Sequence, residues 1–430
     1  MFALISVVLL CCSPLRALDS NLRLSQYGHT AWRVREGYFS GPLFAIAQTK
    51  DGQLWIGGAS GLLRFDGVHF SPPPETMNLP DFRIYSLLGA SDGSLWIGTG
   101  RGLARWKEGK LTIYAKNGRF AALIEDRYGT VWAGHTRALN EVPPLCSFAA
   151  GAFQCFRASE KFPLRYIGSL GEDSEGNLWV GGEGAVCRWE AETPDCYDLP
   201  ARPRADRFGV YALATDSHGD IWVDGGPTGI WRLVSGHWLP NKNLPGLKAE
   251  SEAMLSDREG SLWIGDIANG LIRRVNGNID RFTQNDGLSG NAINNIFEDR
   301  EGNMWVATSG GLDRFRDVKV VTLSPRQELP LDRAWSVTSS KDGGLWISGM
   351  HTLVHMNQNR MRTYETGREL PAKNIADIFE DHRGRLWVGI GSSLLWRDDE
   401  DRFHEFRLPK ISTAQRRLSR WLRRRTALFG

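Results

Sequence analysis

The sequence predicts an all-β fold, a β-propeller of four-stranded blades with nine repeat units, and two observations carry this prediction. A tryptophan recurs nine times, and six of the eight intervals between successive members are 41 to 43 residues long. A glycine stands three residues before each of these tryptophans. Self-similarity at a period of ~40–45 residues is typical of propeller blades. The tryptophans are Trp55, Trp96, Trp132, Trp179, Trp222, Trp263, Trp305, Trp346 and Trp387.

Each unit is expected to contain four short strands. In the first unit an inner strand covers residues 44–48, and a glycine turn connects it to the tryptophan strand. A Gly-Leu turn leads to a third strand over residues 62–65, and Asp66-Gly67 turns into an outer strand over residues 68–70. Glycine at the hairpin suits a backbone with positive φ, which other residues adopt only at an energetic cost. We expect the tryptophans to wedge between adjacent blades.

The two ends of the repeat region define the expected domains. Residues 31–37 align with residues 281–287, the outer strand and turn before the seventh unit, so the chain begins with an outer strand. Such a strand closes a ring by pairing with the last blade. The prediction is a seven-bladed propeller over residues 29–320 and two further blades over residues 321–410. A single nine-bladed ring is the alternative.

Charge and hydropathy single out the two termini. Residues 1–18 are expected to be a signal peptide, because an apolar run from Phe2 to Leu10 precedes a small residue, Ala17. Residues 411–430 form a basic tail with six arginines and no acid, expected to be disordered. The net charge of +3, less those six arginines, leaves −3 for the rest of the chain. The folded part therefore gives no electrostatic argument for nucleic-acid binding.

The cysteines fit an exported protein. Cys146 and Cys155 are nine residues apart, and so are Cys187 and Cys196, at equivalent places in two consecutive units. Two cross-strand disulfides are the expectation. Zinc sites have shorter cysteine spacing and more ligands nearby. Cys11 and Cys12 lie in the expected signal peptide. The signal peptide and the two expected disulfides together predict a periplasmic location.

Candidate ligand-binding residues are found by counting back from each tryptophan along the inner strand. The ninth residue is always apolar and is expected to be core, whereas the eleventh and thirteenth vary among aromatic, charged and amide side chains. A repeat that varies one face resembles a ligand-reading surface in the central funnel, the alternative being solvated channel residues. The candidates are Arg83, Tyr85, Arg119, Tyr166, Tyr211, Glu252, Asn294, Arg333 and Trp335.

The stretches His29–Trp32, Ile46–Gly57 and Gly61–Gly67 resemble repeats of the two-component-regulator propeller family, and the resemblance extends over about residues 29–406. It implies the extracytoplasmic sensor region of a bacterial hybrid or ordinary histidine kinase. In that family two seven-bladed propellers precede a small β-sandwich, a membrane span and a cytoplasmic transmitter. This chain has nine units, no hydrophobic span after residue 18 and no kinase motif. The resemblance therefore implies a sensor input without its transmitter part.

The function expected from these features is ligand sensing in a two-component receptor, with no catalytic residues, no metal and no cofactor. The expected partners are a small polar ligand, with a carbohydrate as one candidate, and a sensor kinase or a second copy of the chain. Membrane contact is expected only through missing or upstream segments. Two alternatives remain. One is a free-standing propeller enzyme that cleaves glycans as a hydrolase or a lyase, and the other is a protein-interaction scaffold of the cell envelope. The acidic turns before the tryptophans could hold calcium, although a hairpin turn also explains them.

Overall fold

The computed structural model describes residues 18–74, 78–136, 143–190, 193–200, 209–225, 229–240, 251–267, 269–318, 329–331, 333–357 and 360–406, without the side chains of Ser251 and Glu252. Most of the expected signal peptide, Cys11, Cys12 and the basic tail lie outside these residues. The described residues form nine antiparallel sheets of four strands each, which confirms the predicted all-β propeller fold class. None of their helices is long and apolar enough to cross a membrane.

The strands follow the predicted order within each unit. The first three sheets are β2 (Leu43–Gln48), β3 (Leu54–Gly58), β4 (Gly61–Phe65) and β5 (Phe70–Ser71); β6 (Ile84–Gly89), β7 (Leu95–Thr99), β8 (Gly102–Lys107) and β9 (Lys110–Ala115); and β10 (Phe120–Glu125), β11 (Val131–His135), β12 (Leu145–Ala149) and β13 (Ala152–Phe156). The next three are β14 (Ile167–Glu172), β15 (Leu178–Gly182), β16 (Ala185–Arg188) and β17 (Asp195–Asp198); β18 (Leu213–Thr215), β19 (Ile221–Asp224), β20 (Ile230–Val234) and β21 (His237–Pro240); and β22 (Ser251–Ser256), β23 (Leu262–Asp266), β24 (Gly270–Val275) and β25 (Asn278–Phe282).

The seventh sheet takes one strand from the start of the chain. It consists of β1 (Gly28–Arg33), β28 (Gly311–Arg316), β27 (Met304–Thr308) and β26 (Ile293–Glu298), in that order. The last two sheets are β29 (Ser336–Ser339), β30 (Leu345–Ser348), β31 (Thr352–Asn357) and β32 (Arg360–Glu365); and β33 (Ile375–Glu380), β34 (Leu386–Ile390), β35 (Ser393–Arg397) and β36 (Phe403–Phe406). The described part of the chain also contains three one-turn 3-10 helices: η1 (Leu24–Gln26), η2 (Val34–Glu36) and η4 (Gln284–Asp286).

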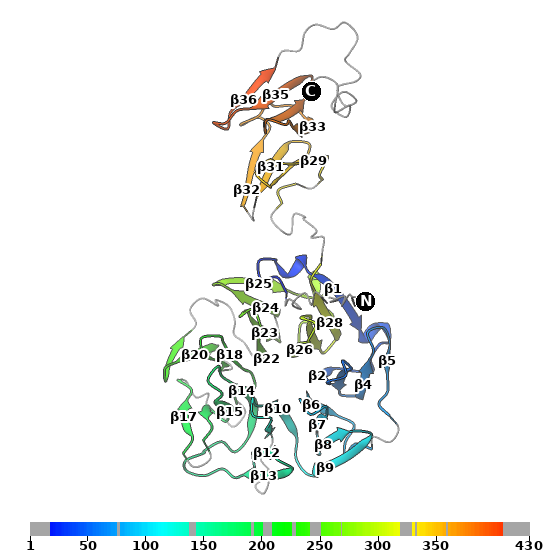
Figure 1. Ribbon diagram of the computed structural model, residues 1–430, viewed down its shortest axis with the longest axis vertical. Helices are drawn as coiled ribbons and strands as arrows, with labels where there is room; N and C mark the ends of the chain where they lie inside the picture. The colour runs from blue at the N-terminus through cyan, green and yellow to red at the C-terminus, as the bar shows by residue number, and fades with distance from the viewer. Residues whose placement is uncertain are drawn as a thin grey trace, which may run out of the picture. The chain divides into compact units, whose positions relative to one another are not determined.

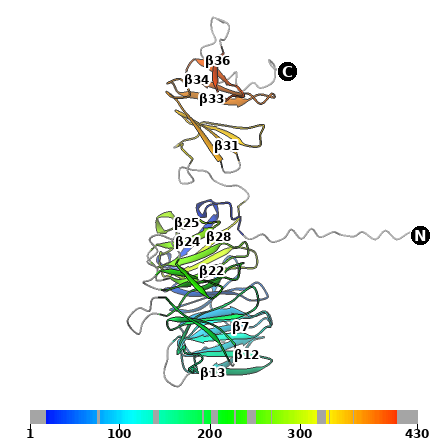
Figure 2. The ribbon, with the colours of Figure 1, turned by 90° about the vertical axis from the view of Figure 1, so that its left-hand side faces the viewer.

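The chain divides into two compact units, Met1–Val320 and Val321–Gly430. In the first unit the inner strands contact one another in the order β2, β6, β10, β14, β18, β22 and β26, and β26 contacts β2 in turn. This series of seven sheets closes around a centre that the inner strands surround (Figure 1), and Figure 2 shows the same unit from the side. In the second unit, β29 and β30 contact β33 of the other sheet.

The expected closing strand is confirmed. β1 pairs antiparallel with β28, with His29 opposite Phe315. The local structure after β1 repeats that after β25, as the sequence alignment predicts: a strand, one 3-10 turn, and then a glycine with positive φ, Gly37 at 84° and Gly287 at 119°. Pairing of β1 removes the free edge that β28 would otherwise present to another chain.

A buried carboxylate joins the first strand to the last sheet of this unit. Asp313 on β28 is fully buried and accepts a hydrogen bond from Nε2 of His29, on β1, at 2.9 Å. It also accepts the backbone N–H of Ser289 at 3.0 Å and the hydroxyl of Ser289. Three donors from two distant parts of the chain therefore converge on one side chain.

The turn before each repeated tryptophan has the backbone that its glycine predicts. All nine glycines have φ between 79° and 92°. In six units an aspartate six residues before the tryptophan accepts the indole N–H, for example Asp299 from Trp305 at 2.7 Å. The other oxygen of Asp299 accepts the backbone N–H of Asn303 at 2.8 Å. These acidic turns are thus hydrogen-bonded as hairpins, and no group of His, Cys, Asp and Glu among the described residues is arranged to hold a metal ion.

The tryptophans lie between neighbouring sheets, as predicted. Trp263 on β23 is fully buried and belongs to one apolar cluster with Ile293, Ile296 and Val306 of the next sheet. Trp305 on β27 likewise packs in a cluster with Ile56 of the first sheet. Trp387, on the ninth sheet, instead contacts Phe379 and Phe406 of its own sheet. Where a tryptophan fills the space between two blades, it holds these consecutive blades together.

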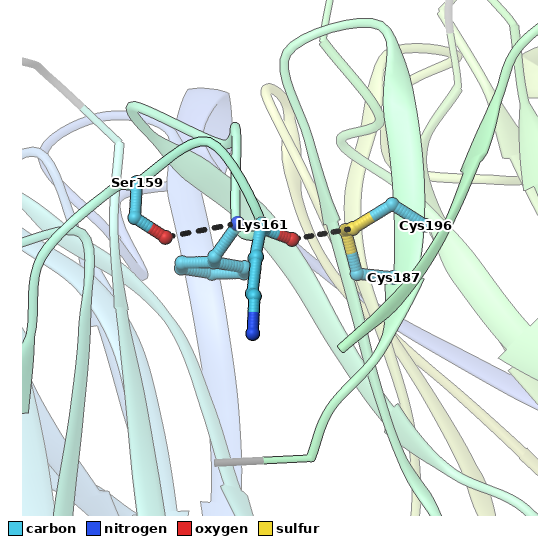
Figure 3. Close-up of a disulfide and its surroundings, with 5 residues drawn as sticks. Ser159, Lys161, Cys187 and Cys196 are labelled. Atoms are coloured by element: carbon cyan, nitrogen blue, oxygen red, sulfur yellow. Dashed lines mark hydrogen bonds between the residues drawn. A yellow bond between two sulfur atoms is a disulfide. The ribbon is translucent and has the colours of Figure 1, made fainter. Parts of the chain in front are cut away.

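Two disulfides link the third and fourth strands of consecutive sheets, which confirms the predicted pairs. Cys146 lies opposite Cys155, and Cys187 lies opposite Cys196, each with Cα atoms 4.0 Å apart. The carbonyl oxygen of Lys161 lies 3.9 Å from Sγ of Cys196, so the loop before β14 packs against the second disulfide (Figure 3).

Replacement of both Cys187 and Cys196 by alanine is expected to lower the free energy of unfolding by about 2–3 kcal/mol, because the bond closes a short loop in the unfolded chain. Urea denaturation of the oxidised proteins measures this difference. Reductant should remove most of the difference in stability between the parent and the variant, because it opens the same disulfide in the parent. Equal midpoints for the oxidised parent and the variant would contradict the expectation.

Candidate functional site

The centre of the first unit holds a cavity of about 640 Å³ to which all seven inner strands contribute. Its volume lies within the range of small-molecule sites. Six of the seven variable eleventh positions in this unit line it. They are Phe44, Tyr85, Ala121, Gly168, Tyr211 and Asn294. The seventh, Glu252, lies on β22 with its side chain outside the described part.

A β-bulge explains why the eleventh position can vary. In six of the seven inner strands of this unit, the pairing with the tryptophan strand skips this one residue, as at Phe44 between Leu43 and Ala45. A bulged residue leaves the ladder and its side chain is re-aimed. Blade packing therefore constrains this position less than its neighbours.

The ninth position requires a correction to the sequence analysis. These residues were expected to be core alone, yet Leu87, Leu123, Leu170, Leu213, Met254 and Ile296 also border the cavity. The ninth position therefore borders the same cavity as the eleventh. Several of these side chains belong to apolar clusters between sheets, Leu87 and Ile296 among them. They make part of the cavity wall apolar.

Aromatic and cationic side chains are stacked across three successive sheets. The rings of Phe44 and Tyr85 are parallel within 7°, with centroids 5.5 Å apart. The guanidinium carbon of Arg119 lies 4.3 Å from the centroid of Tyr85, within cation–π distance. A second stack joins Tyr166 and Tyr211, with centroids 6.5 Å apart. Burial raises the pKa of Tyr166, and a side-chain hydrogen bond with Tyr211 contributes to the same shift.

A second cavity, of about 1080 Å³, shares Tyr85, Arg119, Thr136 and Tyr211 with the first and so continues from it. Its other lining residues come mainly from the turns of the second and third sheets. They are Pro80, Asp81, Phe82, Arg83, Gly100, Arg101, Lys116, Asn117 and Gly118. We call this cavity the channel mouth.

The structure brings together most of the predicted site residues but not all of them. Tyr85, Arg119, Tyr211 and Asn294 line the central cavity, and Arg83 lines the channel mouth. Tyr166 reaches the site through its stack on Tyr211. Arg333 and Trp335 belong to the other unit, where both are exposed.

Sequence reasoning missed the cations that the turns supply. Arg101 lies in the hairpin between β7 and β8, and Lys116 follows β9. Counting back from the tryptophan samples the inner strand only, so these positions were never compared. A comparison of the turn residues of each repeat for arginine and lysine could have identified these two positions.

A buried histidine lies behind the channel mouth. His135, the last residue of β11, is fully buried, and neither ring nitrogen has a hydrogen-bond partner among the described residues. Burial lowers its pKa to about 4. Its ring lies against Gly118, where a Cβ atom would come within 1.8 Å of Nε2. The neighbouring Arg119 and Thr136 line the cavity.

His135 should make stability fall on mild acidification. Between pH 6.5 and about 4 the unfolded chain binds a proton at this residue and the folded chain does not. The free energy of unfolding should therefore lose about 2–3 kcal/mol as the pH falls through this window, and be unaffected by this group above it. Urea denaturation from pH 7 to pH 4, compared with His135→Leu, isolates the effect. Parallel curves for the two proteins would show that His135 does not titrate in this way.

Seven antiparallel sheets around a channel lined by variable residues define a β-propeller with a ligand-sized central cavity. Three segments, residues 161–184, 287–310 and 369–391, match the family model of the two-component regulator propeller. Each spans the inner strand and the tryptophan strand of one sheet. The chain thus carries two-component regulator propeller repeats, as its sequence resemblance implies.

Solved structures agree with this fold. The extracellular domain of BT4673 from B. thetaiotaomicron, described as a hybrid two component system, is 18% identical with a TM-score of 0.56. The match covers 89% of this chain and 53% of that one, so this chain spans about half its length. A streptogramin B lyase is 15% identical with a TM-score of 0.55, over 70% of this chain and all of the lyase. Virginiamycin B lyase from Staphylococcus aureus is 16% identical with a TM-score of 0.53, over 68% of this chain and all of the lyase. No curated protein sequence matches the chain.

Proposed function

We propose that this chain is the ligand-recognising, extracytoplasmic β-propeller of a two-component receptor. The observation that carries the proposal is the central cavity, where blade positions released from the ladder by a bulge present different side chains. A scaffold that fixes its packing residues and varies one ring of inward positions can change ligand without changing fold. The family repeats supply the two-component context.

A periplasmic location is part of the proposal. Two cross-strand disulfides are typical of proteins that fold in an oxidising compartment. The leader expected over residues 1–18 would provide the export route. Recognition of ligand, rather than phosphoryl transfer, is the activity assigned to the described residues.

Joint replacement of Arg83, Tyr85 and Tyr211 by alanine tests this function. Calorimetric titration with a panel of neutral and acidic saccharides should identify a ligand of the parent protein. The triple variant should bind it at least about tenfold more weakly, because stacking and a charge-assisted contact are lost together. Replacement of the exposed Tyr128 by alanine serves as the control and should leave affinity unchanged. A ligand whose affinity survives the triple replacement would remove the cavity from the proposal.

The enzyme alternative is tested on the same panel. Similarity to the two lyases concerns the fold, and a fold hosts unrelated chemistries. Incubation of each saccharide with the protein, followed by mass analysis, should return the saccharide intact. Cleavage or elimination that the triple variant abolishes would replace sensing with catalysis at this cavity.

A further inference from the structure

We propose that the channel mouth selects an anionic ligand, an acidic saccharide that places its carboxylate or sulfate among four cations and its ring against the aromatic stacks. This inference rests on the proposed function, because it names the ligand class of the same cavity. The four cations are Arg83, Arg101, Lys116 and Arg119.

The charge at the mouth is one-sided. Four cationic side chains line it, against one carboxylate, Asp81. One oxygen of Asp81 accepts the backbone N–H of Arg83 at 3.3 Å. An excess of one charge in a concave site concentrates the field and attracts counter-ions. A neutral ligand would leave this excess uncompensated.

The four cations are also free of ion pairs within the described part of the chain. In the same sheet the pattern differs, since Arg105 and Lys107 on β8 both pair with Asp92. Of the four, Arg83, Arg101 and Lys116 are exposed, and all four line the mouth. Asp81 is the one carboxylate among the residues that line the mouth, so the cations are in excess there and an incoming anion would offset that excess.

Arg119 connects the charged mouth to the aromatic part of the cavity. Its guanidinium lies over the ring of Tyr85, and its Nε is buried without a hydrogen-bond partner. Phe44 stacks on Tyr85, so three flat groups lie in series. A guanidinium held against a ring is pre-organised to bind an oxyanion. Tyr211 lines both cavities and is 39% exposed, so its ring offers the apolar surface on which a sugar ring can lie.

The size of the mouth favours an oligosaccharide over an inorganic ion alone. The two connected cavities, of about 640 and 1080 Å³, exceed what one sulfate would fill. A saccharide that carries an acidic group on its ring can contact the cations and the aromatic rings at the same time. A free anion would use the charge alone.

Digalacturonate and its methyl ester form a matched pair of probes, since they differ in charge and share their rings. The parent protein at low salt should bind the acid at least about tenfold more tightly than the ester, and the preference should shrink as salt is added. Arg83→Gln with Arg119→Gln should abolish the preference. Lys110→Gln removes an exposed cation from β9 of the same sheet, away from the mouth, and should preserve it.

Inorganic sulfate distinguishes the two sources of negative charge. If sulfate binds only weakly and competes with the acid, the ring contributes as proposed. Equal affinity for sulfate and digalacturonate would overturn the saccharide assignment. Equal affinity for acid and ester would overturn selection by charge, yet leave the proposed function in place if the triple alanine variant still loses binding. Failure of all three probes to bind at millimolar concentration would also overturn the inference.

Discussion

Trp263→Ala is expected to lower the free energy of unfolding of the first unit by about 3–5 kcal/mol, because a fully buried indole between two sheets leaves a cavity. The loss has a second component. The indole N–H donates to Asp257 at 2.7 Å, and truncation leaves that carboxylate oxygen without its partner. Urea denaturation followed by far-ultraviolet circular dichroism gives the change without relying on tryptophan emission.

Two comparisons show whether burial causes the effect. Trp263→Phe keeps most of the apolar volume and should lose roughly half as much stability or less. Tyr128→Ala removes an aromatic ring that is 79% exposed and should change stability by less than about 0.5 kcal/mol. If Trp263→Ala and Tyr128→Ala proved equivalent, the tryptophan would not hold the blades together.

Asp313→Ala should be comparably damaging, at about 3–5 kcal/mol, because it removes the acceptor of three donors at the joint between the first strand and the last sheet of the ring. His29 Nε2 and the backbone N–H of Ser289 would lose partners at 2.9 and 3.0 Å. The joint should weaken locally before the unit unfolds. Hydrogen exchange should therefore accelerate in β1 and β28 more than in β6 or β10.

A double-mutant cycle separates this joint from general damage. His29→Ala, Asp313→Ala and the double variant should show a coupling free energy of about 1–3 kcal/mol between the two side chains. Exchange of β1 at the parental rate in Asp313→Ala would show that the carboxylate does not secure the strand. If the stability losses of His29→Ala and Asp313→Ala were simply additive in the double variant, the hydrogen bond between these two side chains would not contribute to securing β1.

The repeat, the closing strand and both disulfides were predictable because each leaves a periodic trace. Trp263 and its equivalents recur wherever two blades meet, and Gly260 and its equivalents recur wherever the hairpin needs positive φ. Cys146 and Cys187 stand at equivalent places one blade apart, so a shared cross-strand geometry could be read from spacing. Positions under the same physical constraint repeat, and repetition is visible in one sequence.

The candidate site was predictable only in part. The eleventh position varied visibly, but the bulge that frees Phe44 depends on strand register, which composition does not reveal. Arg101 enters from a turn and so lies outside the inner-strand count. Trp335 holds a position equivalent to Tyr85 but belongs to another unit. The position of a residue in its repeat predicts where its side chain lies on its own sheet. It does not predict which sheets surround the same channel.

The pairing of β1 with β28 sets the order in which the chain can fold. His29 and Phe315 lie near the two ends of the first unit, so their pairing closes a loop of almost the whole unit and needs all of that chain to have been synthesised. During synthesis the first strand must therefore remain unpaired until the last sheet emerges. A linear array of repeats could grow stable one repeat at a time. In this unit β1 is the first strand to be synthesised and among the last to pair. The ring is therefore completed late, in a single step.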